Sequence, residues 1–161
     1  MGPELAADPR ISPYLTANQL ATLSAPAPGK GDPMASYLSR FNIKTASENV
    51  RRLRAAGVRI LAGTDTPNLA AHGVSLHGEL LLLTRAGLTP AEALKAATRA
   101  PAEAFKLANR GRIIPGAIAD LVLVDGNPLA DIKATRAIAQ IFKNGYDVRR
   151  APGETAHPNN R

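Results

Sequence analysis

Asp65 is the residue in this sequence that is best placed to do chemistry, because it ends a short apolar run. Residues 58–63 read VRILAG, and Thr64 and Thr66 flank the aspartate. A run of this length, rich in β-branched residues and bounded by glycines, predicts a buried strand. In a βα barrel, side chains at the carboxyl ends of the strands converge on the face where reactions take place. A carboxylate there can accept a proton from water or bind a metal ion.

The same aspartate also has a purely structural interpretation. Asp side chains at the start of loops commonly accept hydrogen bonds from backbone N–H groups of the following turn. Asp65 precedes the turn residues TPN, which suit this role. The residues alone therefore leave catalysis and loop capping as two open alternatives.

Histidines are the other candidate residues, and there are three: His72, His77 and His157. A catalytic zinc needs about three protein ligands, so Asp65 cannot hold one by itself. His72 and His77, in the next loop and helix, are one possible pair of further ligands. The alternative is that they cap or pack, as a histidine near a helix start more often does. His157 lies in the tail, where we expect no specific role.

A helix is predicted immediately before the strand. Thr45 and Glu48 have the spacing of a capping box, and Gly57 supplies a left-handed stop, so the helix covers residues 46–56. Its apolar positions repeat every three residues and predict a buried stripe: Val50, Leu53 and Ala56.

Three helices are predicted after Asp65. Residues 75–86 place leucines on one helical face and end at a glycine. Thr89 and Glu92 form the capping box of the second helix, and a third ends near Leu107. This part of the chain is therefore a strand followed by helices.

The pattern becomes alternating near the carboxyl terminus. Residues 119–125 (ADLVLVD) predict a strand, and residues 138–148 predict a hairpin. Asn144 and Gly145 suit the two positive φ values of a type I′ turn.

Composition excludes several classes of protein. The 161 residues fit one domain or part of a larger one, and the absence of cysteine excludes disulfides and thiolate metal sites. The net charge is +7, but basic residues are scattered among acids and only 4% of residues are aromatic, which disfavours nucleic-acid binding. We find no signal-peptide pattern and no apolar run of membrane-spanning length. We therefore expect a cytoplasmic protein without membrane contact.

Five motifs, in order and spacing, resemble the carboxyl-terminal part of the metal-dependent amidohydrolases, nearest to the imidazolonepropionase-like and prolidase-like subgroup. They are the GTD strand, SLHGEL, LTPAEALKAAT, RGRIIPGAIADLVLVDGNPLADI and a strand ending KNG. The resemblance covers roughly residues 8–150. It implies an α/β fold, the last strand and following helices of a (β/α)8 barrel plus strands of a small β-sandwich.

The resemblance also implies a reaction and its residues. Residues 58–63 become the eighth barrel strand, and Asp65 becomes the residue that contacts the metal and carries the proton of the attacking water. His77 falls near the substrate pocket. The implied reaction is hydrolysis of a C–N bond in a small amide, cyclic amide or dipeptide, with one or two divalent metal ions, usually zinc.

This sequence departs from the family pattern in its metal ligands. The HxH pair, the central lysine or glutamate and two later histidines of the family have no counterparts here, and neither do the first six strands. We therefore expect a carboxyl-terminal portion that is inactive alone and that needs a complementing chain or self-associates. The alternative function is a non-catalytic interaction module, with a nucleic-acid binder as a more distant third.

The predicted organisation has four parts. Residues 1–40 are irregular with one short helix near 15–23, and residues 41–110 are the terminal barrel portion. Residues 111–150 carry the β-sandwich strands and hairpin, and residues 151–161 form a disordered tail.

Overall fold

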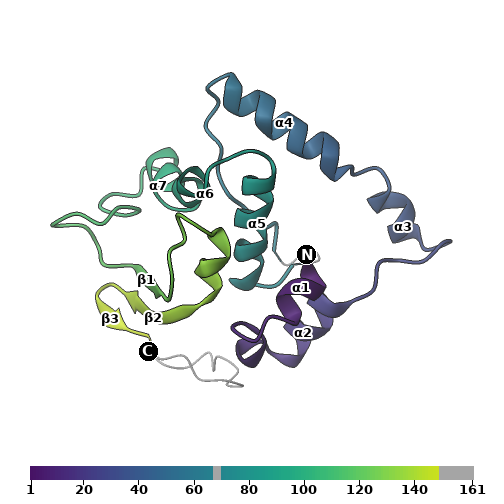
Figure 1. Cartoon of the computed structure of the whole chain (residues 1–161), viewed down its shortest axis with the longest axis horizontal. Coiled ribbons are helices and arrows are strands. Elements are labelled where there is room, and N and C mark those ends of the chain that lie inside the picture. Colours follow the sequence, from purple (N-terminus) through teal and green to yellow (C-terminus); the bar gives the residue numbers. More distant parts are fainter. Residues whose placement is uncertain (67–69, 149–161) are drawn as a thin grey trace.

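Helix α5 is the element around which the others are arranged in the computed structural model, which describes residues 1–66 and 70–148 (Figure 1). In chain order the elements are α1 (Gly2–Ala6), η1 (Ser12–Tyr14), α2 (Ala17–Ser24), α3 (Pro33–Leu38), α4 (Ile43–Ala55), α5 (Val74–Arg85), α6 (Pro90–Ala97), α7 (Arg99–Ala104), β1 (Leu121–Val124), η2 (Ile132–Arg136), β2 (Ile138–Lys143) and β3 (Tyr146–Asp147). The described part of the chain is therefore mostly helical. Its one sheet is antiparallel, with strand order β1-β2-β3. No helix in these ranges has the length and apolar character needed to cross a membrane.

The larger apolar cluster joins α5, α6 and η2. Its buried members are Leu80, Leu81, Leu83, Leu88, Ala93, Ala96 and Ile132. Each leucine removed from water in this way contributes roughly 1.5–3 kcal/mol. The apolar face predicted for residues 75–86 is confirmed, since Leu80 and Leu83 are buried and Leu76 is half-buried. This cluster fixes α5 against α6.

A second cluster packs the amino-terminal helices against the other side of α5. Its buried members are Leu5, Ala6, Ile11, Leu15, Leu23 and Ala71. Gly78 of α5 allows a close approach, because a Cβ there would lie 3.0 Å from the Met1 side chain and 3.3 Å from that of Leu5. Residues 1–40 thus contain more helix than the sequence predicted, although the expected helix near 15–23 is present as α2 with a capping box at Thr16.

A buried arginine connects this amino-terminal part to η2. Arg136 is 3% exposed, and its Nη1 lies 3.2 Å from carboxylate oxygens of both Glu4 and Asp8. Asp8 is held in turn by Arg10, whose Nη2 donates to its carboxylate at 2.7 Å. The cluster joins residues more than a hundred positions apart.

The strand predicted over residues 58–63 is wrong for the described structure. The segment is irregular, and its backbone bond to α6 runs from the Ala62 N–H to the Ala96 carbonyl at 2.9 Å. Ile60 and Ala62 still pack against the larger cluster. A strand needs a neighbouring strand for its ladder, and the described residues place none beside this segment. The apolar pattern is therefore satisfied by helix packing alone.

The helix before this segment begins earlier than predicted. Asn42 is the N-cap of α4, and its side chain accepts from Lys44 N–H at 2.9 Å, so Thr45 lies inside the helix. Glu48 pairs with arginines one turn later instead of closing a capping box. The predicted stop at Gly57 is confirmed by its φ of 75°.

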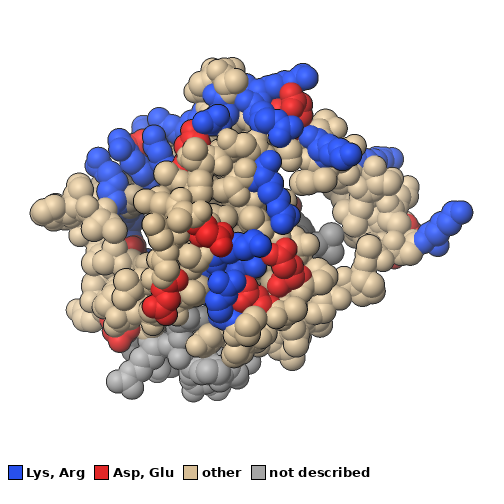
Figure 2. All heavy atoms as spheres, in the orientation of Figure 1, with Lys and Arg blue, Asp and Glu red and all other residues tan. Residues whose placement is uncertain are grey.

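The buried stripe predicted on this helix is also wrong. Leu53 is 46% exposed, Ala56 is exposed, and α4 has no buried residue, although Val50 packs against the larger cluster. The helix lies along one edge of the described structure and contacts α5, away from the sheet of the described residues (Figure 1). On the face drawn in Figure 2, basic side chains of the described residues gather along α4 and near α7, interrupted by acidic and uncharged ones.

The predicted carboxyl-terminal strands are present, but burial along β1 does not alternate, since Val122 and Leu123 are both exposed. β1 pairs antiparallel with β2, and β2 turns into β3 through Asn144 and Gly145, whose φ values are 52° and 84°. The capping box of Thr89 and Glu92 is likewise present at α6. The predicted disordered tail, 151–161, lies outside the described residues.

Candidate active site

Asp65 lies at the end of the irregular segment, where the chain turns away from α6. Its backbone adopts a left-handed conformation, with a φ of 50°. Asp and Asn are the non-glycine residues that tolerate this region best, because their short side chains interact locally with the backbone. The neighbouring hydroxyls of Thr64 and Thr66 are 2.7 Å apart and brace the turn.

The Asp65 side chain is exposed. Among residues 1–66 and 70–148 it has no hydrogen bond or ion pair, so its carboxylate is available to a ligand in this part of the chain. The loop-capping alternative concerns the backbone of residues 67–69, which lie outside the described residues. The predicted catalytic and metal-binding roles of Asp65 stay predictions.

His77 is placed by a hydrogen bond to the carboxyl-terminal part of the chain. Its Nδ1 lies 3.1 Å from the Thr135 hydroxyl, which itself donates to the Ile132 carbonyl at 2.8 Å. Because that hydroxyl proton is already used, Nδ1 is the donor to Thr135. The half-buried ring is therefore oriented, and its predicted contact with substrate stays a prediction. His72 is exposed in the loop before α5, and His157 lies outside the described residues.

A cavity of about 200 Å³ lies beside the segment that carries Asp65. Its walls come from α1, α2, the end of the irregular segment and one side of α5. The polar residues in its lining are Thr64, Ser75 and Glu79. Burial raises the pKa of the Glu79 carboxyl, and a hydrogen bond from the Gly63 N–H opposes part of that rise. Glu79 lines the same cavity as Gly63 and Thr64 and is therefore a second carboxylate near the segment that carries Asp65.

Sequence reasoning missed Glu79. It lies within the quoted SLHGEL motif, four residues after Ser75, so the two side chains share one helical face. The signal that pointed to it was a single carboxylate on a leucine-rich helix. That Glu79 lies beside Gly63 in the cavity lining is a tertiary contact, which the helical periodicity does not predict.

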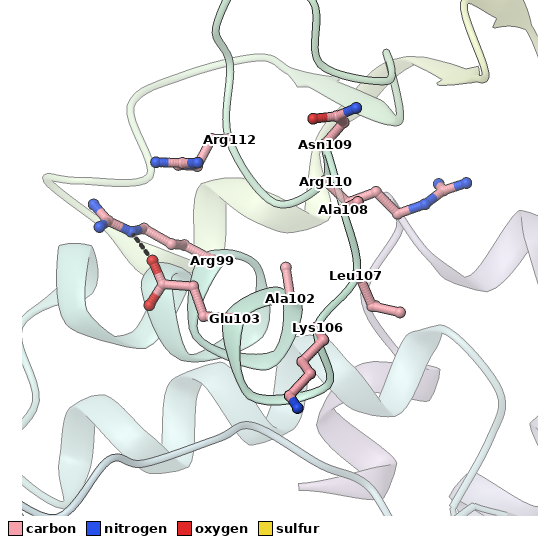
Figure 3. A pocket seen from close by; sticks show the side chains of 9 residues that line it. All are labelled: Arg99, Ala102, Glu103, Lys106, Leu107, Ala108, Asn109, Arg110 and Arg112. Atoms are coloured by element: carbon pink, nitrogen blue, oxygen red, sulfur yellow. Dashed lines mark hydrogen bonds and ion pairs between the residues drawn. The ribbon is translucent and has the colours of Figure 1, made fainter.

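A second cavity, of about 260 Å³, is formed by α7 and the loop after it (Figure 3). Arg99 donates to Glu103 at 2.6 Å inside it, and Figure 3 shows the Arg110 guanidinium turned away from that pair. Gly111 lets the loop pack directly against the start of α7, because a Cβ there would lie 2.7 Å from the Thr98 carbonyl oxygen. The lining residues include no histidine and no carboxylate other than the paired Glu103. We therefore do not place a reaction there.

The described residues do not fit the metal ion that the resemblance implies. Within residues 1–66 and 70–148, no three His, Cys, Asp or Glu side chains come together as a metal-binding group. A catalytic zinc needs about three such ligands. Asp65 and its surroundings in this part of the chain therefore do not constitute a metal centre on their own.

Comparison with known proteins agrees with the motifs. The family model described as the amidohydrolase family matches residues 13–148. The chain belongs to the amidohydrolase family. Its described structure is a partial amidohydrolase-like structure, mostly helical with a small three-stranded antiparallel sheet, so the family resemblance inferred from the five motifs is confirmed.

Relatives include enzymes that take their names from different substrates. Imidazolonepropionase of Streptomyces griseus is 33% identical over 126 residues, which are 74% of this chain and 32% of that protein. Ochratoxinase of Aspergillus niger is 37% identical over 95 residues, covering 56% of this chain and 19% of the relative.

A solved structure gives the same result for the fold. A prolidase in complex with N-methylphosphonate-L-proline is 28% identical with a TM-score of 0.64, covering 86% of this chain and 34% of that one. The amidohydrolase chain thus spans about a third or less of the length of the proteins it matches.

Proposed function

We propose that this amidohydrolase chain is the carboxyl-terminal portion of a hydrolase acting on C–N bonds, and that Asp65 supplies the carboxylate that moves the proton. The observation that carries the proposal is the exposed Asp65 side chain, which has no partner among the described residues and ends a segment held against α6. The family relatives named for imidazolone, ochratoxin and prolyl substrates support the reaction class.

The chemistry assigned to Asp65 is a proton relay. The carboxylate accepts a proton as water forms its bond to the carbonyl carbon, and it donates that proton to the nitrogen as the C–N bond breaks. The products are a carboxylic acid and an amine. The substrate class is a small amide, a cyclic amide or a dipeptide, and the remaining groups of such a site come from residues other than those described.

The test compares Asp65→Asn with the matched variant Asp125→Asn in the full-length product of the gene in which this sequence lies. Asn keeps the size and the tolerance for a left-handed backbone, so the comparison isolates the charge. Asp125 is an exposed turn aspartate with no side-chain bond among the described residues. On amide, cyclic amide and dipeptide substrates we expect kcat to fall on the order of 10²–10⁴-fold for Asp65→Asn only. Equal turnover by both variants would refute the assignment.

A second candidate function is a non-catalytic interaction module, which one feature of the sheet favours. Within the described residues β1 pairs only with β2, and its Val122 and Leu123 are 58% and 55% exposed. A strand with an open edge and apolar side chains can pair with another chain. A metal-free oligomer of the 161-residue chain would favour this function, and stoichiometric tightly bound zinc in the same chain would favour the hydrolase.

A further inference from the structure

The cavity between α7 and the loop after it has an excess of positive charge. Its lining carries one carboxylate, that of Glu103, and four basic side chains: Arg99, Lys106, Arg110 and Arg112. Arg110 pairs outside this lining with Asp120. Lys106 and Arg112 form no ion pair with the residues that the structure describes. A concave surface lined mainly by one sign of charge concentrates ions of the opposite sign, so this cavity attracts anions.

Two guanidinium groups, those of Arg99 and Arg112, lie on the same side of this cavity (Figure 3). Arg99 donates through Nε to Glu103 at 2.6 Å, so its terminal nitrogen atoms, Nη1 and Nη2, have no acceptor among the described residues. Arg112 makes no side-chain hydrogen bond in this part of the chain. A guanidinium presents paired N–H donors whose spacing matches that of phosphate oxygens. Two such groups beside one cavity favour an oxyanion as the ligand.

The loop that carries Arg112 is held in place by two backbone contacts. The Ile118 N–H donates to the Asn109 carbonyl at 2.8 Å and closes the loop. Gly111 packs against the start of α7, where a Cβ would lie 2.7 Å from the Thr98 carbonyl oxygen. Arg112 therefore follows a turn whose position is fixed against the helix that carries Arg99.

Backbone N–H groups of the same turn add further donors. Asn109 and Gly111 have positive φ values of 55° and 76°. Turns with left-handed residues bring successive N–H groups toward one side, and the resulting concavities bind anions. The N–H groups of Gly111 and Arg112 have no acceptor among the described residues. The turn thus has unused backbone donors next to the Arg112 guanidinium.

We propose that this cavity binds a phosphate group, with Arg99 and Arg112 donating to its oxygens and the turn at residues 109–112 forming one wall. Glu103 holds Arg99 in place and, because it is an anion itself, weakens the binding. The volume of about 260 Å³ is several times the roughly 30 Å³ of one water molecule, so inorganic phosphate or a small phosphate monoester fits. The inference is independent of the role proposed for Asp65, which is not in this lining.

The test titrates inorganic phosphate into the 161-residue chain while NMR follows the amides of Gly111 and Arg112. The ionic strength is kept constant with sodium chloride, because salt screens surface charges. We expect saturable shifts of these two amides. Arg112→Gln should weaken binding about 10- to 100-fold, the value of one charge-assisted hydrogen bond. Arg112→Lys should recover part of that loss, because it restores the charge without the planar fork. Arg40→Gln, which removes an exposed arginine outside the cavity lining, is the matched control and should leave the affinity unchanged.

A variant of Glu103 is expected to act in the opposite direction. Glu103→Gln keeps an oxygen that accepts from Arg99 and removes the negative charge, so phosphate should bind about fivefold more tightly, the effect of one unit charge about 4 Å away in water. Glycerol 3-phosphate distinguishes the two sources of the phosphate group. Tighter binding than that of inorganic phosphate would assign a monoester, and weaker binding would assign the free ion.

Three results would overturn the proposal. The first is a set of Gly111 and Arg112 shifts no larger than those from an equal concentration of chloride. The second is an equal loss of affinity in Arg112→Gln and Arg40→Gln. The third is retention of a short single-stranded DNA without any saturable phosphate shift at Gly111, because that would show a diffuse basic surface instead of a site.

Discussion

Replacing Asp8 by asparagine tests the buried ionic cluster that joins the two ends of the chain. The Asp8 side chain is 6% exposed and receives Arg10 Nη2 at 2.7 Å and Arg136 Nη1 at 3.2 Å. The substituted amide would keep an oxygen for the Arg10 backbone N–H but would turn its NH₂ group toward cationic donors. Arg136, 3% exposed, would retain only Glu4 as a carboxylate partner among the described residues.

The magnitude follows from the burial of Arg136. Removing one partner of a buried ion pair costs about 3–5 kcal/mol, because the other charge is left uncompensated. We place Asp8→Asn near the lower end, about 3 kcal/mol, since Glu4 remains at 3.2 Å. With a urea m value of roughly 2 kcal/mol/M, the unfolding midpoint should fall by about 1.5 M.

The assay is urea unfolding followed by circular dichroism, with Asp125→Asn as the exposed control. Two atoms of Arg136, Nε and Nη2, are buried without a protein partner in the described structure, so the charge is already costly. The double variant Asp8→Asn/Arg136→Met should therefore recover much of the lost stability. A midpoint for Asp8→Asn equal to that of the control would refute the reasoning, and so would a double variant less stable than Asp8→Asn alone.

The same cluster predicts a dependence on pH. Hydrogen bonds from Arg10 hold the pKa of Asp8 well below its usual value of 3.8. Its contribution to stability is therefore fully present above pH 3.8 and is lost as the pH falls below it. Asp8→Asn should show a shallower loss of stability in acid than the wild-type chain, and an identical acid profile would contradict this.

Two further changes test the packing around α5 and α6. Leu80 is 3% exposed at the centre of the larger cluster, so Leu80→Ala should cost about 2–5 kcal/mol in urea unfolding. Leu129→Ala, at a position 59% exposed, should cost under about 0.5 kcal/mol, and equal costs for the two would be contrary to the packing described. The Thr89 N–H, with Arg54, lowers the pKa of Glu92 to about 2 from 4.5, so its stabilisation is present above pH 4.5 and is lost toward pH 2. The midpoint of thermal unfolding should depend less on pH in this range for Glu92→Gln than for the wild-type chain, and an equal dependence would show that the Glu92 charge contributes nothing to stability.

The helices after Asp65 were predictable because their signals are local. Thr89 and Glu92 are three residues apart, and the leucines of α5 repeat with the helical period, so each element is specified by its own residues. The turn at Asn144 and Gly145 is equally local, since both need positive φ. These features appear in the structure where the sequence placed them.

The failures concern features that depend on distant partners. Residues 58–63 have the composition of a strand, but a ladder requires neighbouring strands, and the described structure offers α6 instead. Leu53 has helical spacing with its neighbours yet stays 46% exposed, because the described residues place no sheet under α4. The pairing of Arg136 with Glu4 and Asp8 joins positions 128 or more residues apart, which no local pattern encodes.

The site was predictable in part for the same reason. Asp65 was identified because it ends an apolar run, but its left-handed backbone required coordinates. His77 was expected near substrate, and its bond to Thr135 depends on a residue 58 positions away. Local pattern thus identified the carboxylate, and tertiary contacts determine how it is presented.

The position of Asp65 in a crystal structure of the full-length gene product with a bound phosphonate analogue tests the account most directly. The account predicts an Asp65 carboxylate oxygen within about 3 Å of a phosphonate oxygen, the distance of a proton acceptor from its donor. An Asp65 side chain turned away from the analogue and hydrogen-bonded only to the backbone of its own loop would contradict it.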